Sequence, residues 1–390
     1  MEWAIEALDT LFFRGPDPFI AGESVFLRSL FPPTPRTIQG MVRTTLLEEH
    51  CTDLSLFAAG KCDRCPVEET CAVRDVVGSP QGIGTLRLRG PYVLCKVRGG
   101  FTRLYPTPGD LRVDECDKPF RLALGDPTPC DMGNVRLPRG RDGTAYFGED
   151  DVDRGWITEE GLRSYLDGDL PMAEQLVGRS KLLDGEPRVG LARDAKTRTA
   201  LKSMLYSIEP LRPRSGVGLG VRVDGAPDSL LRAGLGLRRL GGEGRLVDVT
   251  ERVASAMAPL GAPARAEIAR TGRLLLLLLQ PADFDGNWLP HGFSRYDENG
   301  VTIWRGQVKG IALKIIVSCG GSPVAIGGWS LADGHSTALR RYVPAGTVYY
   351  CELEGPFDVD SVLNMLDDAK VGGDTEIGFG HMAVGAWVEG

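Results

Sequence analysis

The sequence predicts an α+β protein built from two ferredoxin-like (RRM-like) domains, with a long β-hairpin and a glycine-rich C-terminal loop. Segments rich in β-branched and aromatic residues outnumber amphipathic ones, so strands should exceed helices. Each half of the chain contains a strand, a helix and further strands, an order that suits two such sandwiches better than an alternating parallel sheet. At 390 residues the chain exceeds what one core usually serves, so we expect domains over residues 1–262 and 263–390.

The first domain opens with a strand and a helix. The segment from Trp3 to Phe13 alternates imperfectly and ends in a turn, Arg14-Gly-Pro-Asp-Pro, which is typical of a strand. Thr34 is a good N-cap and Pro35 suits the first helical position, and apolar residues recur at helical spacing through about His50. A cysteine-rich loop should follow this helix.

The sequence of the rest of the first domain predicts strands and a long hairpin with a basic tip. Residues 85–97 and 101–105 favour two strands, whereas residues 106–180 are poorly patterned apart from a short helix near 159–166. Strands over 189–192 and 204–209 flank a polar tip of Lys, Arg and Thr. This cysteine-rich loop and this hairpin both belong to the domain expected over residues 1–262.

The sequence of the second domain predicts several strands and one short helix. Apolar or β-branched runs at 273–280, 311–318 and 346–353 favour strands, and 358–367 is a short amphipathic helix. A glycine loop then leads into a last strand over 382–388. We find no internal sequence repeat.

The composition indicates a folded protein that stays in the cytoplasm. Apolar residues make up 42% and charged residues 25% of the chain, close to the globular average. The N-terminus carries acids where a signal peptide needs a basic flank, so we expect no export. The densest apolar run, Leu274 to Leu279, is far shorter than the roughly 20 residues that span a bilayer, which excludes a membrane partner at this segment.

The net charge of −7 hides an uneven distribution of basic residues. Residues 81–141 hold 11 Lys and Arg against 6 Asp and Glu, and residues 181–245 hold 13 against 7. The remainder carries 21 basic against 39 acidic residues. One basic face on an acidic body would suit phosphates, although ordinary solvated loops explain the counts equally well.

Four of the nine cysteines fall close together in the sequence. Cys51, Cys62, Cys65 and Cys71 lie within 21 residues, and Cys62-x2-Cys65 has the spacing of a metal knuckle. Four thiolates suit tetrahedral Zn²⁺ or, alternatively, an iron–sulfur cluster. Because the other two gaps are irregular, unliganded reduced thiols stay open as an interpretation.

Several segments could approach a phosphate backbone. Glycines in Gly378-Phe379-Gly380-His381 would let backbone N–H groups come close, and Phe379 could stack on a base, although simple turn chemistry explains the glycines as well. The first helix has an N-terminus suited to anions, with Arg36, Gln39 and Arg43 on or beside its polar face. Solvated arginines on a surface helix are the alternative there. The glycine turn before Arg245 is a second glycine site, where Arg245 could meet a phosphate or pair with Glu243.

Taken together, several of these segments resemble one family, the third subunit of type III-B CRISPR (Cmr) effector complexes, a RAMP-superfamily protein. The resemblance spans nearly the whole chain except residues 51–78 and much of 106–180. The matching segments are Leu8-Asp-Thr-Leu-Phe-Phe-Arg14-Gly-Pro-Asp-Pro-Phe19, Gly22-Glu-Ser24, Pro32-Pro-Thr-Pro-Arg36-Thr-Ile-Gln39-Gly40, Arg188-Val-Gly-Leu, Leu205-Tyr206, Leu240-Gly-Gly-Glu-Gly-Arg245, Ile326-Gly-Gly-Trp329-Ser-Leu, Val343-Pro-Ala-Gly346-Thr-Val-Tyr349 and Gly378-Phe-Gly.

This resemblance implies a pair of ferredoxin-like domains that hold the 5′ tag of crRNA and do not cut it, as the five-type Cas subunits do. The partners it implies are crRNA, the large polymerase-like subunit and the RAMP backbone subunits, in antiviral defence. Carried over residue by residue, the expected RNA-binding positions are Arg14, Arg36, Gln39, Arg43, Arg193, Lys196, Arg198, Lys202, Arg245, Gly378, Phe379, Gly380 and His381.

Two other functions stay open at this point. The type III-A counterpart subunit would do the same work, although the segments around Trp329 and Pro344 favour type III-B. A crRNA-processing endoribonuclease of the same superfamily would need a His as general base with a Lys or Tyr nearby. His381 is the best candidate among the four His residues, and a structural role is its alternative.

Overall fold

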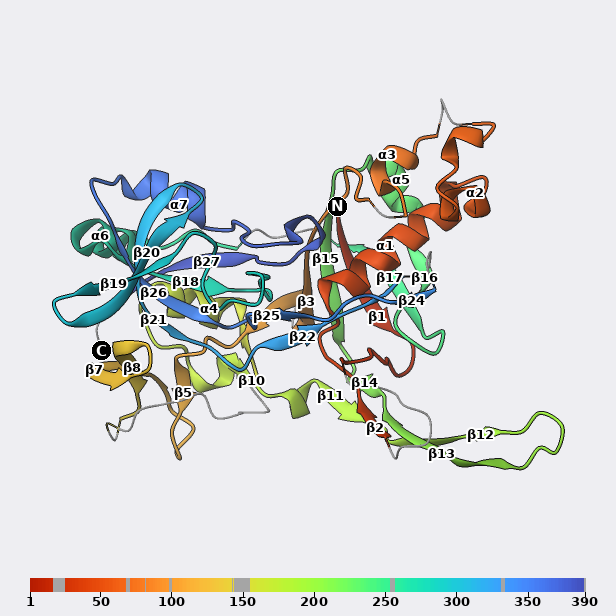
Figure 1. The fold of residues 1–390 in the computed structure, drawn as a ribbon, viewed down its shortest axis with the longest axis horizontal. Coiled ribbons are helices and arrows are strands. Elements are labelled where there is room, and N and C mark those ends of the chain that lie inside the picture. The colour runs from red at the N-terminus through yellow and green to blue at the C-terminus, as the bar shows by residue number, and fades with distance from the viewer. Residues whose placement is uncertain are drawn as a thin grey trace.

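The computed structural model describes residues 1–16, 25–67, 71–80, 82–97, 100–141, 143, 155–252, 257–330 and 334–388. The fold is a mixed α+β structure with more strands than helices, and most of its strand pairs are antiparallel. Two large sheets lie side by side, and a long hairpin, part of a separate three-stranded sheet, projects beside the first (Figure 1). The α+β class predicted from the sequence is therefore confirmed.

The first sheet has eight strands in the order β10-β9-β4-β3-β15-β1-β17-β16. Each neighbouring pair is antiparallel. The first strand is shorter than the predicted segment from Trp3 to Phe13. β1 ends at Ala7, and only isolated β-bridges at Leu11 and Arg14 follow it. The strands are β1 (Glu2–Ala7), β3 (Arg87–Val97), β4 (Gly100–Pro106), β9 (Trp156–Thr158), β10 (Leu176–Val177), β15 (Val217–Asp224), β16 (Gly236–Arg239) and β17 (Leu246–Arg252).

Helix α1 (Pro35–His50) packs on this sheet as the sequence predicted. The Thr34 side chain accepts the N–H of Thr37 at 3.3 Å, and Pro35 occupies the first turn. The apolar residues of α1 that recur at helical spacing are buried in one core with β1 and β15. The helical spacing of the apolar residues therefore determines which face of α1 packs against the sheet. Short helices α3 (Arg74–Val77) and α5 (Asp228–Ala233) complete this layer, and α2 (Leu54–Ala58) lies beyond them.

The second sheet has six strands in the order β19-β20-β21-β26-β18-β27. The interior strand β18 lies between β26 and the edge strand β27, and its Leu274–Leu278 run is at most 3% exposed, as expected of a strand with neighbours on both sides. The elements are α6 (Ala262–Thr271), β18 (Arg273–Leu278), β19 (Ser294–Glu298), β20 (Val301–Val308), β21 (Ile311–Cys319), β26 (Val348–Leu353), α7 (Val359–Leu366) and β27 (Met382–Ala386).

The segment that the sequence left unorganised lies mostly against the second sheet. It forms two small hairpins and then α4, which packs with the last strand. Tyr92 and Tyr105 of the first sheet share one continuous hydrophobic core with the second sheet. The boundary at residues 262 and 263 stays a prediction. The added elements are β5 (Leu111–Val113), β6 (Pro119–Arg121), β7 (Ala123–Cys130), β8 (Gly133–Arg139) and α4 (Glu159–Leu166).

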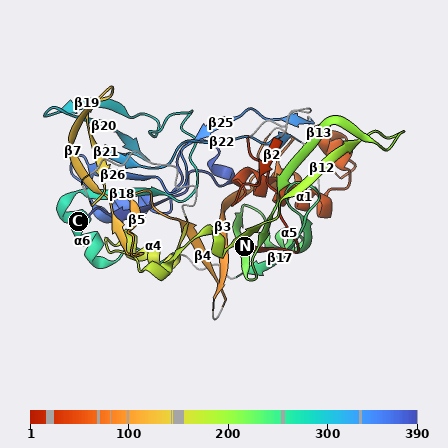
Figure 2. The same ribbon diagram turned by 90° about the horizontal axis from the view of Figure 1, so that it is seen from below.

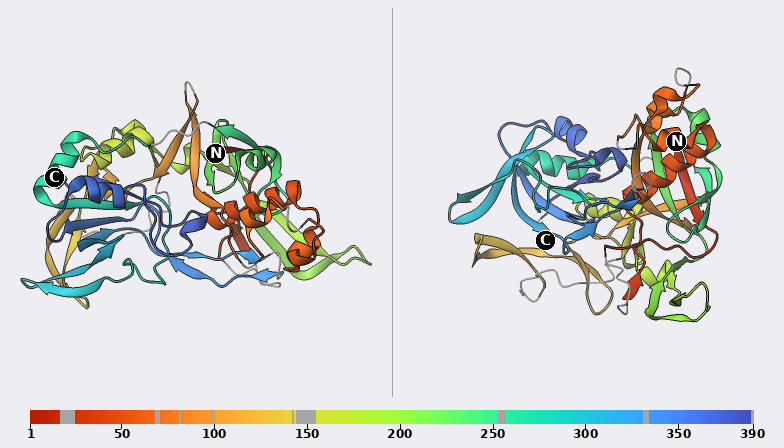
Figure 3. Two further views of the ribbon diagram at one scale, coloured as in Figure 1. Left: turned by 90° about the horizontal axis from the view of Figure 1, so that it is seen from above. Right: turned by 45° about the vertical axis from the view of Figure 1, so that its right-hand side comes forward.

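The predicted hairpin is present and projects from the body. It consists of β12 (Arg188–Arg193) and β13 (Ala200–Glu209), with β2 (Val25–Arg28) added in parallel to β13. Figure 2 and the left view of Figure 3 show its tip extending well past the rest of the chain. The remaining short strands are β11 (Leu183–Gly185), β14 (Leu211–Pro213), β22 (Val324–Ile326), β23 (Trp329–Ser330), β24 (His335–Ser336) and β25 (Arg340–Tyr342).

Candidate nucleic-acid interface

The tip of the hairpin is closed by one aspartate. Oδ1 of Asp194 accepts the backbone N–H groups of Lys196 at 2.8 Å and Thr197 at 2.7 Å. These hydrogen bonds hold the pKa of Asp194 below its ordinary value, because they favour the ionised carboxylate. Arg198 takes a left-handed backbone conformation, with φ of 58°. The turn is thus built from its own polar residues and is exposed on all sides.

The tip carries three exposed cations and one carboxylate, Asp194, and so has an excess of positive charge. Arg193, Lys196 and Arg198 are exposed, and none of the residues that the structure describes forms an ion pair with them. The Lys202 side chain lies outside the described part of the chain. Elsewhere between residues 181 and 245 carboxylates take up much of the positive excess, pairing with Arg188, Arg212, Arg214, Arg222, Arg232, Arg238 and Arg245. A phosphate chain would therefore meet exposed cations at the tip that no described carboxylate pairs with.

The same hairpin has an apolar side that the sequence reasoning missed. Leu191 lies opposite Leu205, and Val189, Ser207 and Phe26 form the next row on the same face. We call Phe26, Val189, Leu191 and Leu205 the outer face. They are between 48% and 70% exposed, whereas the opposite side packs Ile208 and Leu27 against Phe12. Apolar residues at consecutive positions of β12, in place of strict alternation, were the available signal.

Arg36 lies at the junction of the two sheets rather than open to a ligand. Its guanidinium donates to Oδ2 of Asp374 at 2.5 Å, and the Tyr342 hydroxyl donates to the same oxygen at 3.2 Å. Asp374 comes from the loop before the last strand, 338 residues away in sequence. This contact ties the start of α1 to the C-terminal glycine loop.

The other predicted arginines have structural partners of their own. Arg43 donates to the backbone oxygen of Ser79 at 2.6 Å and so holds the loop after α3. Arg245 pairs with Asp9 at 3.3 Å. Arg14 is exposed and forms a β-bridge with Ser29, and Gln39 is partly exposed on α1. The structure therefore does not gather the predicted RNA-binding residues into one patch.

The glycine loop is buried, contrary to an open phosphate-binding turn. Phe379 is 0% exposed and its ring lies 4.7 Å from that of Tyr342, so a base cannot reach it. A Cβ on Gly380 would lie 1.7 Å from the Val371 carbonyl oxygen, and φ of 67° there also favours glycine. The glycines serve close backbone packing at the junction, which a local pattern alone does not distinguish from ligand approach.

His381 has the neighbours of an acid–base site but no access to a substrate. Its Nε2 lies 2.7 Å from Oδ1 of Asp368, and its Nδ1 lies 3.1 Å from the Tyr92 hydroxyl. Burial lowers the pKa of His381 below its ordinary value. Lys370 lies near it and donates to the carbonyl oxygens of Leu88 and Thr375. Because His381 is only 3% exposed, this network is suited to holding the sheets together.

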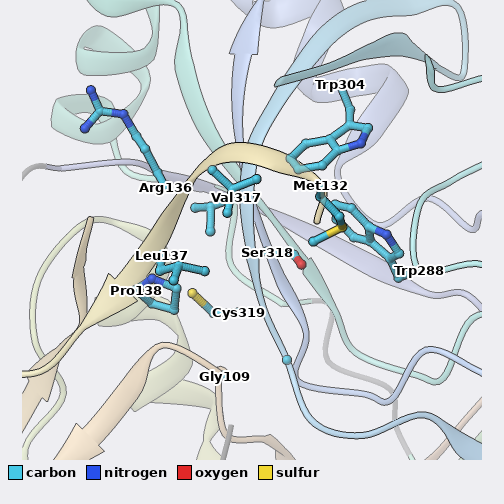
Figure 4. Close-up of a pocket in the computed structure, with 12 residues that line it drawn as sticks. Gly109, Met132, Arg136, Leu137, Pro138, Trp288, Trp304, Val317, Ser318 and Cys319 are labelled. Carbon is cyan, nitrogen blue, oxygen red and sulfur yellow. The ribbon is translucent and has the colours of Figure 1, made fainter. Parts of the chain in front are cut away.

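A separate cavity of about 370 Å³ lies between β8 and the second sheet. Trp288 and Trp304 meet edge to face in its wall, with ring centres 4.9 Å apart. Figure 4 shows Met132 beside Trp288 and the Arg136 guanidinium directed away from both rings. None of the described residues that line it is a His, Asp, Glu or Lys, so this cavity offers no such group for acid–base chemistry.

The four clustered cysteines line one small pocket at the end of α1, and all of them are free thiols. As the side chains stand, no group of three or more His, Cys, Asp or Glu among the described residues is arranged to hold a metal ion. In the same described ranges, no helix is long and apolar enough to cross a membrane.

Comparison with known families decides what the chain is. The family model of the CRISPR-associated protein Cas_Cmr3 matches residues 3–387, nearly the whole chain. The chain belongs to the Cmr3 family. The resemblance to the third subunit of type III-B Cmr complexes is thereby confirmed, and it favours this assignment over the type III-A counterpart. No curated protein matches the sequence of this Cmr3 family member.

Solved structures agree with the fold of this Cmr3 family member. A chain from the cryo-EM structure of the type III-B Cmr-beta complex bound to cognate target RNA and AMPPnP has 14% identity and a TM-score of 0.52, over 98% of each chain. A chain from the complex bound to cognate target RNA has 14% identity and a TM-score of 0.50, over 98% of this chain and 96% of that chain. At this identity the likeness concerns the fold alone.

Proposed function

We propose that this chain is the non-catalytic subunit of a type III-B CRISPR ribonucleoprotein that binds the 5′ tag of crRNA in antiviral defence. The observation that carries the proposal is the exposed hairpin tip, where Arg193, Lys196 and Arg198 have no carboxylate partner among the described residues. Cations of this kind bind phosphates and leave base identity to other contacts. Lys202, Arg14 and Gln39 extend the proposed RNA contact beyond the tip.

The buried residues of the glycine loop support a protein that holds RNA without cutting it. An endoribonuclease reading would require His381 to reach a ribose hydroxyl, yet its ring is enclosed by Tyr92 and Asp368. We assign Arg36, Arg43, Arg245 and the loop from Gly378 to His381 to the fold and not to RNA. The proposed interface is thus smaller than the sequence suggested.

The strand orders support the proposed duplication of a ferredoxin-like unit. In the first sheet the neighbouring strands are β3-β15-β1-β17. Along the chain, β1 comes first and is followed by α1, and α5 precedes β17, the last of the four. In the second sheet β21-β26-β18-β27 repeats that order, with α7 before the last strand. Both follow the split β-α-β-β-α-β arrangement, except that no helix takes the first crossover within the described part of the second unit.

The outer face supports a protein partner next to the RNA. Four large apolar side chains exposed together on one small sheet are unusual on a surface that meets only water. We propose that a RAMP backbone subunit covers this face while the tip holds the RNA, and that the body contacts the large polymerase-like subunit. Because the tip and the outer face share two strands, both contacts would be fixed together.

The experiment that tests the proposal compares labelled crRNA carrying an intact, mutated or deleted 5′ tag. The full chain, alone and in the reconstituted complex, should bind the intact tag most tightly. Arg193→Ala/Lys196→Ala/Arg198→Ala should lower the salt slope of binding by about 2, since each phosphate contact to a single strand contributes about 0.7. Equal binding of all three RNAs would overturn the proposal.

A matched control removes the same charge elsewhere on the surface. Lys118, Arg239 and Arg295 are also exposed, and Lys118→Ala/Arg239→Ala/Arg295→Ala should leave the salt slope nearly unchanged. If both triple variants lose the same slope, the tip acts only through net charge. Incubation with a repeat-containing crRNA precursor tests the second part of the proposal, that the chain does not cut RNA. Cleavage products that vanish in His381→Ala would establish the nuclease function.

A further inference from the structure

Cysteines from three stretches of the chain line one small cavity beside α1. Cys51, Cys62, Cys65 and Cys71 all line a single enclosed cavity of about 20 Å³, together with Leu47, Phe57 and Val73. All four thiols therefore border the same small space.

Two of these cysteines are fixed by the core. Cys51 is the C-cap of α1, where its N–H donates to the Leu47 carbonyl at 2.9 Å. Cys71 lies just before Val73 and α3, and both Cys51 and Cys71 pack partly buried against the core of the first sheet. This pair forms a rigid base on the protein body.

The other two belong to a segment with no core of its own. Between Ala58 and Val67 every residue is exposed except Cys62 and Cys65, and α2 has no buried residue. The Cys65 N–H donates to the Cys62 carbonyl at 3.0 Å, so the turn presents both thiols on one side. Within residues 58–67, the two cysteines are thus the only side chains that are not exposed.

We propose that the four thiolates bind one Zn²⁺ ion, which fastens the 58–67 segment to the end of α1. The cysteine spacing supplies a two-residue knuckle and two outside ligands, as tetrahedral structural zinc requires. The proposal requires the knuckle to close onto Cys51 and Cys71, because the described thiols as they stand are not yet arranged around an ion. A cavity of about 20 Å³ suits a single ion better than an iron–sulfur cluster.

The surroundings favour such a charged centre. Four thiolates around one divalent ion leave two negative charges, and Arg74, a cation, lines the same cavity. Four protein ligands leave no open position for water, so the ion is structural. It supplies the order that a segment without buried apolar residues cannot supply itself.

The test uses the full chain purified without added metal. Zinc measured by elemental analysis should be equimolar with protein, absent from Cys62→Ser/Cys65→Ser and retained by Cys116→Ser/Cys130→Ser, whose two cysteines are exposed and lie away from the cavity. Lys61 and Arg64 make the segment a substrate for trypsin. Its cleavage should become about tenfold faster or more when the metal is lost, because local order then disappears.

Three results would overturn the inference. The first is protein without zinc in which all the thiols react with a mercurial or disulfide reagent. The second is iron with visible absorbance, which would indicate a cluster. The third is trypsin cleavage of the wild-type chain as rapid as that of the Cys62→Ser/Cys65→Ser variant. None of these outcomes bears on RNA binding by the hairpin, so the two proposals fail separately.

Discussion

The hydroxyl of Tyr92 lies 3.1 Å from Nδ1 of His381, and this contact joins β3 of the first sheet to the residue before β27 of the second. Because Nε2 faces the Asp368 carboxylate at 2.7 Å, Nε2 carries the proton and Nδ1 accepts from tyrosine. Burial lowers the pKa of His381, which agrees with a neutral ring. The two sheets therefore share a hydrogen bond as well as a core.

Tyr92→Phe should destabilise the fold by about 1–3 kcal/mol, because Nδ1 of His381 would then be a buried acceptor without a donor. Urea unfolding monitored by circular dichroism measures this. Tyr296→Phe is the control, since Tyr296 is 46% exposed, and it should change the free energy of unfolding by less than about 0.5 kcal/mol. Equal effects of the two changes would show that the hydroxyl contact contributes nothing.

Because of Lys370, the free energy of unfolding should increase as the pH rises above about 8. Burial, with Arg89 nearby, lowers the pKa of Lys370 to about 8 from its ordinary 10.5. The unfolded chain thus binds more protons than the folded chain between these values, and the free energy of unfolding increases with pH across that window. Lys370→Met lacks this group, so the difference between wild type and variant should grow from pH 8 to 10. A constant difference would contradict the prediction.

Gly380→Ala should cost far more than an alanine at another left-handed glycine. At Gly310, φ is 83° and no atom lies within 4 Å of an added Cβ, so Gly310→Ala pays only backbone strain of about 1–2 kcal/mol. At Gly380 the added carbon also meets the Val371 carbonyl, and we expect a loss of about 3 kcal/mol or more. Thermal or urea unfolding of both variants checks this, and similar losses would mean that the loop can move aside.

Substitutions on the outer face should separate assembly from folding. Leu191→Ser/Leu205→Ser replaces side chains that are 49% and 56% exposed, so the free energy of unfolding should change by less than about 1 kcal/mol. Assembly with the backbone subunit should weaken at least about tenfold, because buried apolar contacts are lost there. Leu237→Ser, at a position 58% exposed on β16, is the control and should assemble normally. Unaltered assembly of the double variant would remove the outer face from the interface.

The sequence by itself determined the elements whose signals are local. The Thr34 cap and the apolar period through Leu46 predicted α1, and the leucine run from 274 to 278 predicted the buried strand β18 of the second sheet. The hairpin with its polar tip and the family motifs were equally readable, because a turn, a cap or a motif depends on residues that are neighbours in the chain.

Only the tertiary structure decided which of the basic and aromatic residues are free to contact RNA. Arg36 is paired with Asp374, and Phe379 lies under Tyr342, although both residues looked suited to RNA. Residues 107–139 pack against the second sheet as separate hairpins, since their apolar side chains find their partners there. A free charge or an open ring depends on which distant side chain folding brings beside it, and no local pattern carries that information.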